Sequence, residues 1–446
     1  MTSNVQLNLA TVAGGSTIAT EDIGGIQFQR VKLALGASGQ DLGDVSGVNP
    51  MVVEMGGASI SAFGDLITAE NTPLVQLDFV YGINTQTGVT AVVGTGVADT
   101  NASRLRLQTG TGATGAALFT SRNTAKYRAG QGVTLRFTKV FTTGVANSRQ
   151  VAGIGTTNNG YFFGYNANVF GLLYRNAGVD VWTAQTSWNG DKCNGSGTSG
   201  FTLIPTFGNV YQIRYPYLGY GVITFWILNP TTGRWILAHT IQYPNTSASV
   251  QISNPNMNYY DQVINTGNTS NLISYTGSVA ALLSGVRSFI ANPKWAFDNN
   301  KTTITAETSL FSIKNATSYN GVENKGLNRL NSISFGCAAT NAAAVVRLRI
   351  GATLGGTATY TPINGSSADN GVTITSGNSV ASYNTLHTTS TGGTQIFCLS
   401  TNGTGNAGID LTAFDLFIAP GEILTVAGFS TANATQSASL SWTEDI

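Results

Sequence analysis

The chain has 446 residues, of which only 10% are Asp, Glu, Lys or Arg, and its formal net charge is +1. An average soluble domain has about 25% charged residues, so most of this surface must be neutral. The near-zero charge excludes the basic footprint of a protein that binds nucleic acid or an anionic membrane. The 54 glycines and the many Ser, Thr and Asn residues favour strands and tight turns over helices.

Residues 1–60 contain too little apolar surface for a core of their own. One apolar-rich run, TEDIGGIQFQRVKLAL at 20–35, stands among glycine-rich stretches. Such a segment must gain burial from the rest of the chain or from a partner, and we expect it to add a strand to a neighbour's sheet edge. The residues predicted to form this anchoring strand are Ile26, Phe28, Val31, Leu33 and Leu35.

The beginning of the chain lacks the features of a targeting segment. MTSNVQLNLATVAGG has neither the basic region nor the apolar region of a signal peptide. No apolar run reaches the roughly 18 residues that a membrane span needs. We therefore expect neither a signal peptide nor membrane insertion.

Residues 61–290 show repeated strand patterns. Apolar and polar residues alternate over 133–138, which predicts a half-buried strand. The range 209–228 reads as two strands broken at 218–221, and 234–242 reads as another strand. Short strands at near-regular spacing, separated by Gly, Asn and Pro turns, predict a β-sandwich or jelly roll.

The remaining third of the chain reads as a second β unit. The irregular stretch 291–308 is interpreted as a linker, and residues 309–446 as a smaller sandwich domain. Apolar and polar residues alternate at 347–350 and at 413–418, and Leu440 and Trp442 lie in a last predicted strand. The fold class predicted from these patterns is all-β.

The three cysteines do not form a disulfide framework, because their number is odd. Cys337 and Cys398 lie in the same predicted domain, whereas Cys193 lies in the preceding one. A pair of small buried thiols is favoured over a bond between Cys337 and Cys398.

Two motifs that can carry chemistry have a structural interpretation here. Gly110, Gly112 and Gly115 match a dinucleotide fingerprint, but the sequence that follows reads as a strand, which favours a hairpin connection. His239 and His387 fall in different predicted domains; the first is expected in a sheet and the second at the surface. We expect no cofactor, no metal and no catalytic residue.

One grouping of acids and aromatic residues lies within 180–191. Asp180 and Asp191 flank Trp182 and Trp188, and a carboxylate pair beside tryptophans is one way to cleave a glycan. The favoured alternative is that both tryptophans pack in the sandwich and that Asp191 stabilises a turn. If a host glycan is bound instead, Trp182 and Trp188 are the predicted contacts.

Several segments together resemble those of bacteriophage virion surface proteins. TEDIGGIQFQRVKLALGASGQDLGDVSGVNPMVV is similar to a stretch that recurs in such proteins. FGDLITAENTPLVQLDFVYGIN, KYRAGQGVTLRFTKVFTTG, NNGYFFGYN and TSWNGDKCNG resemble the lectin-like jelly roll of head-fibre, decoration and tail-fibre proteins. The stretch SLFSIKNATSYNGVENKGLNRLNSISF and the ending LFIAPGEILTVAGFSTANATQSASLSWTEDI resemble a C-terminal β-sandwich of the same proteins.

The resemblance implies a structural, non-enzymatic protein at the virion surface. The first expectation is a head-fibre or decoration protein, a homotrimer whose N-terminal segment docks onto capsid, neck or tail proteins of the same particle. The second is a tail-fibre or baseplate protein that binds host surface glycans. A polysaccharide depolymerase that uses Asp180 and Asp191 is the third alternative, and it rests on these residues and not on the resemblance.

Overall fold

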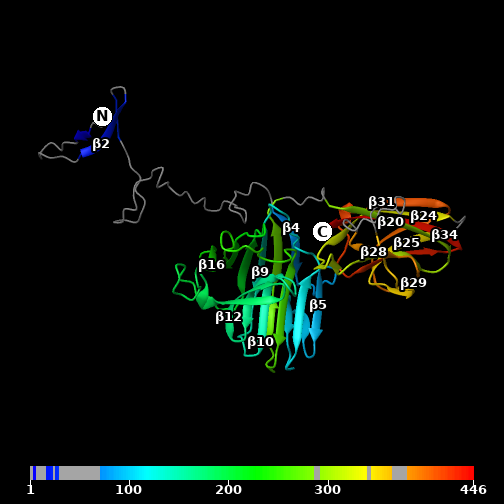
Figure 1. The fold of residues 1–446 in the computed structure, drawn as a ribbon, viewed down its shortest axis with the longest axis horizontal. Helices are drawn as coiled ribbons and strands as arrows, with labels where there is room; N and C mark the ends of the chain where they lie inside the picture. Colours follow the sequence, from blue (N-terminus) through cyan, green and yellow to red (C-terminus); the bar gives the residue numbers. More distant parts are fainter. Residues whose placement is uncertain are drawn as a thin grey trace. The chain divides into compact units, whose positions relative to one another are not determined.

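The computed structural model describes residues 4–6, 17–23, 26–29, 71–285, 292–338, 343–363 and 379–445. The chain divides into two compact units, Met1–Ser59 and Ile60–Ile446. Strands form almost all regular structure in the described ranges (Figure 1), so the predicted all-β fold class is confirmed. No helix in these ranges has the length and apolar character needed to cross a bilayer.

Three short strands lie in the first unit: β1 (Asn4–Gln6), β2 (Thr17–Ile23) and β3 (Ile26–Gln29). They form one antiparallel sheet in the order β1-β2-β3. Ile26 and Phe28 of the predicted anchoring strand belong to β3, whereas Val31, Leu33 and Leu35 lie outside the described residues. The anchoring role of this segment remains a prediction.

Residues 71–285 form a β-sandwich, called here the first sandwich. One sheet has seven strands in the order β13-β12-β11-β10-β17-β8-β5, and the other has six in the order β16-β15-β14-β9-β19-β4. The seven are Val179–Ala184, Val169–Asn176, Gly160–Asn166, Ser148–Gly155, Asn258–Asn265, Ala116–Ser121 and Gly88–Val93. The six are Trp235–Ile241, Ile223–Leu228, Asn209–Tyr215, Val133–Lys139, Ser278–Leu283 and Thr72–Asp78. A three-stranded sheet in the order β18-β7-β6 comprises Ile273–Thr276, Arg104–Gln108 and Val97–Asn101.

Aromatic rings fill the space between the two large sheets. Phe137 of β9 stacks on Tyr211 of β14 with ring centroids 5.5 Å apart, and Phe163 of β11 lies 4.7 Å from Tyr211. Apolar residues alternate in β9, which sends one row of side chains into this core, whereas β11 is buried on both faces and contributes Phe163 to the core and Phe162 to the opposite face. Burial of many large rings is the main favourable contribution to this fold.

One ion pair also crosses this core. Lys139 of β9 donates to both carboxylate oxygens of Asp261 of β17, at 2.6 and 2.5 Å, and both residues are almost fully buried. Ser274, Thr276 and Tyr259 complete the hydrogen bonds around the pair. Burial lowers the pKa of Lys139, and the attraction of Asp261 opposes that shift. The pair joins the six-stranded sheet to the seven-stranded one.

Residues 292–445 contain a second, smaller β-sandwich, called the second sandwich. Its first sheet runs β20-β34-β24-β31, with β32 also paired to β24, and its second runs β27-β28-β21-β33-β25-β30. The first comprises Lys294–Ile304, Ala434–Asp445, Leu327–Ala338, Gly405–Asp410 and Phe417–Ile418. The second comprises Thr361–Pro362, Ala381–Asn384, Thr308–Asn315, Ile423–Ser430, Ala343–Ile350 and Thr394–Asn402. Two further two-stranded sheets are formed by β22 (Ser318–Tyr319) with β23 (Val322–Glu323) and by β26 (Thr353–Gly356) with β29 (His387–Thr391).

The predicted linker at 291–308 is wrong in its central part. Residues Lys294–Ile304 form β20, an eleven-residue edge strand that pairs with β34. Trp295 and Phe297 face inward and pack against the second core, while Asp298 and Asn300 are exposed. The polar residues Asn299 and Lys301 continue the inward-facing row after Trp295 and Phe297, and they hide the period of two in the sequence.

Candidate functional site

The outward face of the seven-stranded sheet carries a row of large side chains. The strand register places four of these side chains in one line across the sheet: Trp182 of β13, Leu173 of β12, Phe162 of β11 and Tyr260 of β17. Gly153 of β10 lies between Phe162 and Tyr260. Phe162, Leu173 and Tyr260 are buried in a small cluster outside the main core, and Trp182 is half-buried against them. We call this surface the tryptophan face.

Glycines make room for the ring of Phe162. It meets the ring of Tyr260 edge to face, with centroids 5.5 Å apart. A Cβ atom at Gly155 or Gly160 would come within 2.2 or 2.4 Å of the Phe162 ring, so a side chain at either position would displace that ring. The glycines therefore allow a flat apolar row on a sheet surface.

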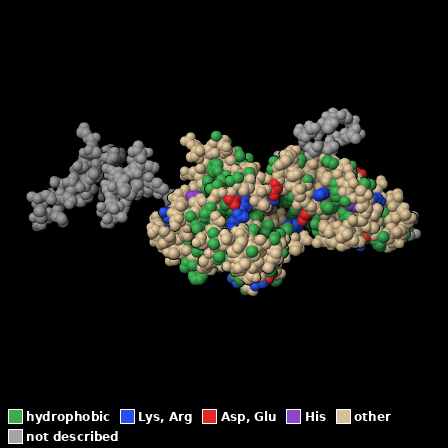
Figure 2. Space-filling view, turned by 60° about the horizontal axis from the view of Figure 1, so that its bottom comes forward, with side chains coloured by type: hydrophobic (Ala, Val, Ile, Leu, Met, Phe, Trp, Pro, Cys, Tyr) green, Lys and Arg blue, Asp and Glu red, His purple; other side chains and the backbone are tan. Residues whose placement is uncertain are grey.

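A three-residue ion-pair network borders this row. Asp180 of β13 accepts two hydrogen bonds from Arg175 of β12, at 2.5 and 3.0 Å, and one from Arg149 of β10 at 2.7 Å. The Arg175 guanidinium also lies 5.9 Å over the Phe162 ring. Figure 2 shows basic and acidic side chains gathered near the middle of one face, on a surface that is otherwise mostly uncharged.

The network keeps Asp180 ionised. Burial alone would raise the pKa of Asp180, but the hydrogen bonds and charges of Arg175 and Arg149 outweigh burial and bring it below the ordinary value. Burial lowers the pKa of Arg149, and the like charge of Arg175 adds to that shift. A carboxylate held in this way suits charge pairing and is a poor proton donor.

Asp191, the other acid of the predicted pair, shapes a loop. Its carboxylate accepts hydrogen bonds from the backbone N–H groups of Cys193 and Ser199, both at 2.8 Å. Burial would raise the pKa of Asp191, and these bonds with Ser199 and Cys193 lower it below the usual value. Both carboxylates are thus engaged in structural contacts, and their arrangement lends no support to an acid pair for glycan cleavage.

The two predicted tryptophan contacts have different environments. Trp188 is only 2% exposed and packs between the sheets against Phe163 and Phe170. The prediction of Trp188 as a glycan contact is therefore wrong, because its ring is covered on all sides. Trp182 lies on the tryptophan face, so it is the one member of the predicted pair that retains an exposed surface.

The two histidines are structural. His239 of β16 accepts a hydrogen bond at Nδ1 from the Asn189 backbone N–H, 3.2 Å away. His387 is 2% exposed, which corrects the expectation that it lies at the surface. It packs beside Tyr360, and its backbone carbonyl accepts a hydrogen bond from Lys301. The Ser and Thr residues around it indicated an exposed position, but they belong to the short strand β29, in which His387 is buried.

Two further expectations concern glycine and cysteine. Gly110, Gly112 and Gly115 connect β7 to β8, which belong to different sheets, so this connection is not the hairpin that was predicted. Cys337 and Cys398 are free thiols; the first is buried and the second exposed.

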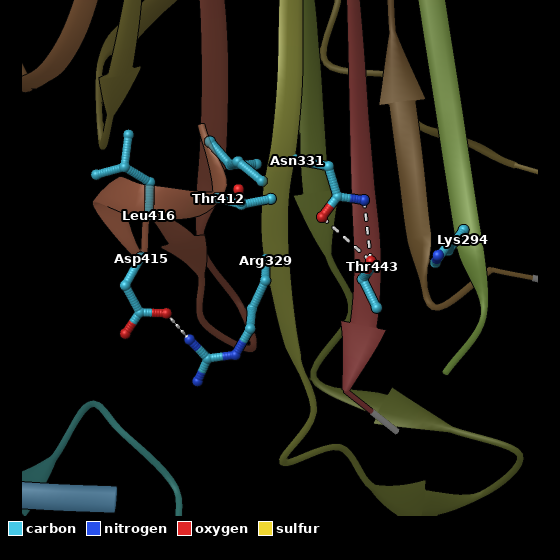
Figure 3. A pocket seen from close by; sticks show the side chains of 8 residues that line it. Lys294, Arg329, Asn331, Thr412, Asp415, Leu416 and Thr443 are labelled. Atoms are coloured by element: carbon cyan, nitrogen blue, oxygen red, sulfur yellow. Dashed lines mark hydrogen bonds and ion pairs between the residues drawn. The ribbon is translucent and has the colours of Figure 1, made fainter. Parts of the chain in front are cut away.

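A hollow of about 520 Å³ lies at one end of the first sheet of the second sandwich (Figure 3). Arg329 pairs with Asp415 across it, and Asn331 and Thr443 exchange hydrogen bonds of 2.9 and 3.2 Å. Lys294 stands apart from these pairs, on β20 (Figure 3). The side chains of Arg329, Asp415, Asn331 and Thr443 are thus engaged with one another.

Small polar side chains continue from this hollow along the same sheet. Ser332 bonds Ser441 at 2.7 Å and Ser334 bonds Ser439 at 2.9 Å, all from the outward faces of β24 and β34. Two further hollows, of about 620 and 540 Å³, lie over this ladder. This serine face was not predicted, because alternate serines at 332–334 and 437–441 are inconspicuous in a chain rich in serine.

Comparisons with known proteins assign the chain to no family. No model of a protein family matches the sequence, and no curated protein is significantly similar to it. Solved structures match about half of the chain. A legume lectin-like domain from Entamoeba histolytica has 12% identity and a TM-score of 0.30, and the match covers 47% of this chain and 97% of that one.

Two further structures are similar at the same level. The Emp47p carbohydrate recognition domain has 10% identity and a TM-score of 0.31, over 49% of this chain and 98% of its own. A glycoside hydrolase family protein from Mycobacterium thermorestibile has 8% identity and a TM-score of 0.34, over 47% of this chain and 99% of its own. Likeness at this level assigns neither a ligand nor an activity.

Proposed function

We propose that this chain is a non-enzymatic surface protein of a bacteriophage particle. Its N-terminal unit attaches it to capsid, neck or tail proteins, and its two β-sandwiches project as a head-fibre or decoration body. The observation that carries the proposal is the division of the chain into Met1–Ser59 and the remainder. The remainder contains two extensive hydrophobic cores.

The physical reason for attachment lies in the contrast between these parts. The sandwiches bury their own apolar side chains, so they have no need of a partner to fold. The described residues of the first unit form three short strands, and isolated small sheets of this kind are marginal in water. Pairing with a strand or groove of another virion protein would supply the missing burial.

A truncation tests the proposal. A chain without residues 1–59 should retain the thermal unfolding transitions of the sandwiches and should disappear from purified particles. A second variant keeps the full chain and replaces Ile26 and Phe28 by Asp. It should reduce occupancy on the particle without altering those transitions. Incorporation of the truncated chain at normal occupancy would contradict attachment through this unit.

Host-glycan recognition is the second candidate function, and the exposed part of Trp182 favours it. Aromatic rings stack on sugars, and the neighbouring Arg149 and Asp180 offer polar groups at 28% and 35% side-chain exposure. Trp182→Ala should then abolish retention on host surface glycan, whereas Val179→Ala on the same strand should not. Equal retention of both variants would exclude a role of this face in glycan binding.

A further inference from the structure

Strand β5 (Gly88–Val93) is an edge strand with an unusual surface. It pairs with β8 on one side and, among the described residues, with no strand on the other. Val89, Val92 and Val93 are 50%, 53% and 58% exposed. An edge of this kind presents unpaired backbone N–H and C=O groups together with apolar side chains, which is a template for pairing with another chain.

The other three edges of the first sandwich are protected against such pairing. At β16 the loop at 189–191 covers the edge, with hydrogen bonds from Gly190 N to Ala238 O and from Asp191 N to Leu237 O. Strand β4 contains a proline and ends at an aspartate, and β13 contains Asp180. Charged residues, proline and covering loops are the usual means by which proteins block edge pairing.

Strand β5 has none of these protections. Its sequence, GVTAVV, contains neither charge nor proline. In the described part of the chain, loop hydrogen bonds reach only its two ends, from Gly88 N to Asn84 O and from Gly96 N to Val93 O. Among the described residues no strand pairs with this uncharged edge, so its backbone groups can pair with a further strand.

We propose that β5 pairs antiparallel with β5 of a second copy of this chain, about a twofold axis at Ala91. The register is self-complementary: Val89 lies beside Val93 of the partner subunit, and Ala91 lies beside its own equivalent. The valines then cover each other on one face of the joined sheet, and no charge enters the contact. A twofold contact of identical patches is the commonest form of oligomer.

This inference does not rest on the proposed attachment to a virion. A single strand pair cannot itself generate the homotrimer expected from the sequence, because its symmetry is twofold. If the truncated chain is still incorporated into particles, the β5 contact is not contradicted. If the β5 contact is absent, attachment through the N-terminal unit is not contradicted, so the two proposals can fail separately.

A disulfide trap tests the register. Directly opposed residues of an antiparallel pair have Cα atoms about 4.5–5.5 Å apart, which is within the range that a disulfide bridges. Ala91→Cys, made in the full chain with Cys398→Ser, should give a covalent dimer under mild oxidation; the remaining Cys193 and Cys337 are buried. Val179→Cys in the same background, exposed at the opposite edge of the sheet, should stay monomeric on a non-reducing gel.

A charge at the same position tests the contact without cysteine chemistry. Ala91 is exposed, so Ala91→Lys should leave the strand content and the unfolding transitions unchanged. It should halve the mass measured by light scattering, because two lysines would meet at the axis. A wild-type chain that is monomeric at the highest soluble concentration would overturn the proposal. So would an oligomer that neither cross-links through Ala91→Cys nor dissociates with Ala91→Lys.

Discussion

The two sandwiches are built to the same plan but fill their interiors differently. The first packs aromatic rings between its sheets and contains a single buried Lys139–Asp261 pair. The second has fewer rings, and like the first it buries polar side chains, among them Asn315, Gln436 and Glu444, which are fully covered. In both sandwiches, alternating apolar residues determine where the strands of each sheet form. Polar side chains whose partners lie far away in the sequence then connect one sheet to the other.

The largest expected effect comes from removing one side of the buried pair. Lys139→Met leaves Asp261 buried without its cation and should cost about 3–5 kcal/mol. The first sandwich should show this cost in calorimetry as a lower transition temperature. Lys192→Met, at an exposed position, is the matched control and should change little.

The double variant Lys139→Met with Asp261→Leu makes the test sharper. Replacing both charges by apolar groups should recover most of the lost stability, since well-packed apolar pairs often equal buried ion pairs. If the double variant is no more stable than the single one, the cost arises from packing and not from an unpaired charge.

A smaller effect is expected from the polar interior of the second sandwich. Glu444 accepts hydrogen bonds from the hydroxyl of Ser379, the backbone N–H of Val380 and the indole of Trp442. Glu444→Ala leaves these donors without their acceptor, at a cost of about 2–3 kcal/mol. Calorimetry of this variant beside Asp298→Ala, an exposed acid of the same sandwich, separates the buried network from a general effect of charge. A cost above that of Lys139→Met would reverse the proposed ranking of the two interiors.

The smallest effect concerns pH. Burial lowers the pKa of Lys126 to about 8, against 10.5 for an ordinary lysine. Between these values the unfolded chain binds more protons than the folded one, so stability rises with pH. We expect Lys126 to contribute a rise of roughly 2 kcal/mol between pH 8 and 10, measured as the difference from Lys126→Met. Cys193 and the buried tyrosines, whose pKa values burial raises, oppose this rise as the pH approaches 10, but equally in both proteins.

Lys126→Met should remove this rise, since the variant has no proton to release at that position. Thermal unfolding of both proteins at several pH values between 7 and 10 measures the difference. Parallel curves for the two proteins would show that Lys126 titrates alike in the folded and unfolded states.

The sequence predicts strands where apolar and polar residues alternate, and β9, β14 and β15 follow those patterns. It fails at β20, where the outer face is polar and the inner one mixed. The sequence does not show which residues pair across the sandwich, because such partners are far apart in the chain: Lys139 and Asp261 are separated by 122 positions. Nor can it distinguish Trp182 from Trp188, because the side of the sheet that each occupies depends on register and on the loop between them.

The pairing of charges within the chain has a consequence for how fast the protein meets its partners. Asp180 offsets one of the two charges of Arg149 and Arg175, and Glu307 offsets one of the two charges of Arg347 and Arg349. The formal net charge of the whole chain is only +1, so little long-range field remains. Without electrostatic steering, protein association proceeds at about 10⁵–10⁶ M⁻¹s⁻¹ and hardly responds to ionic strength. If the proposed contact with a virion protein forms, added salt should therefore leave its association rate almost unchanged.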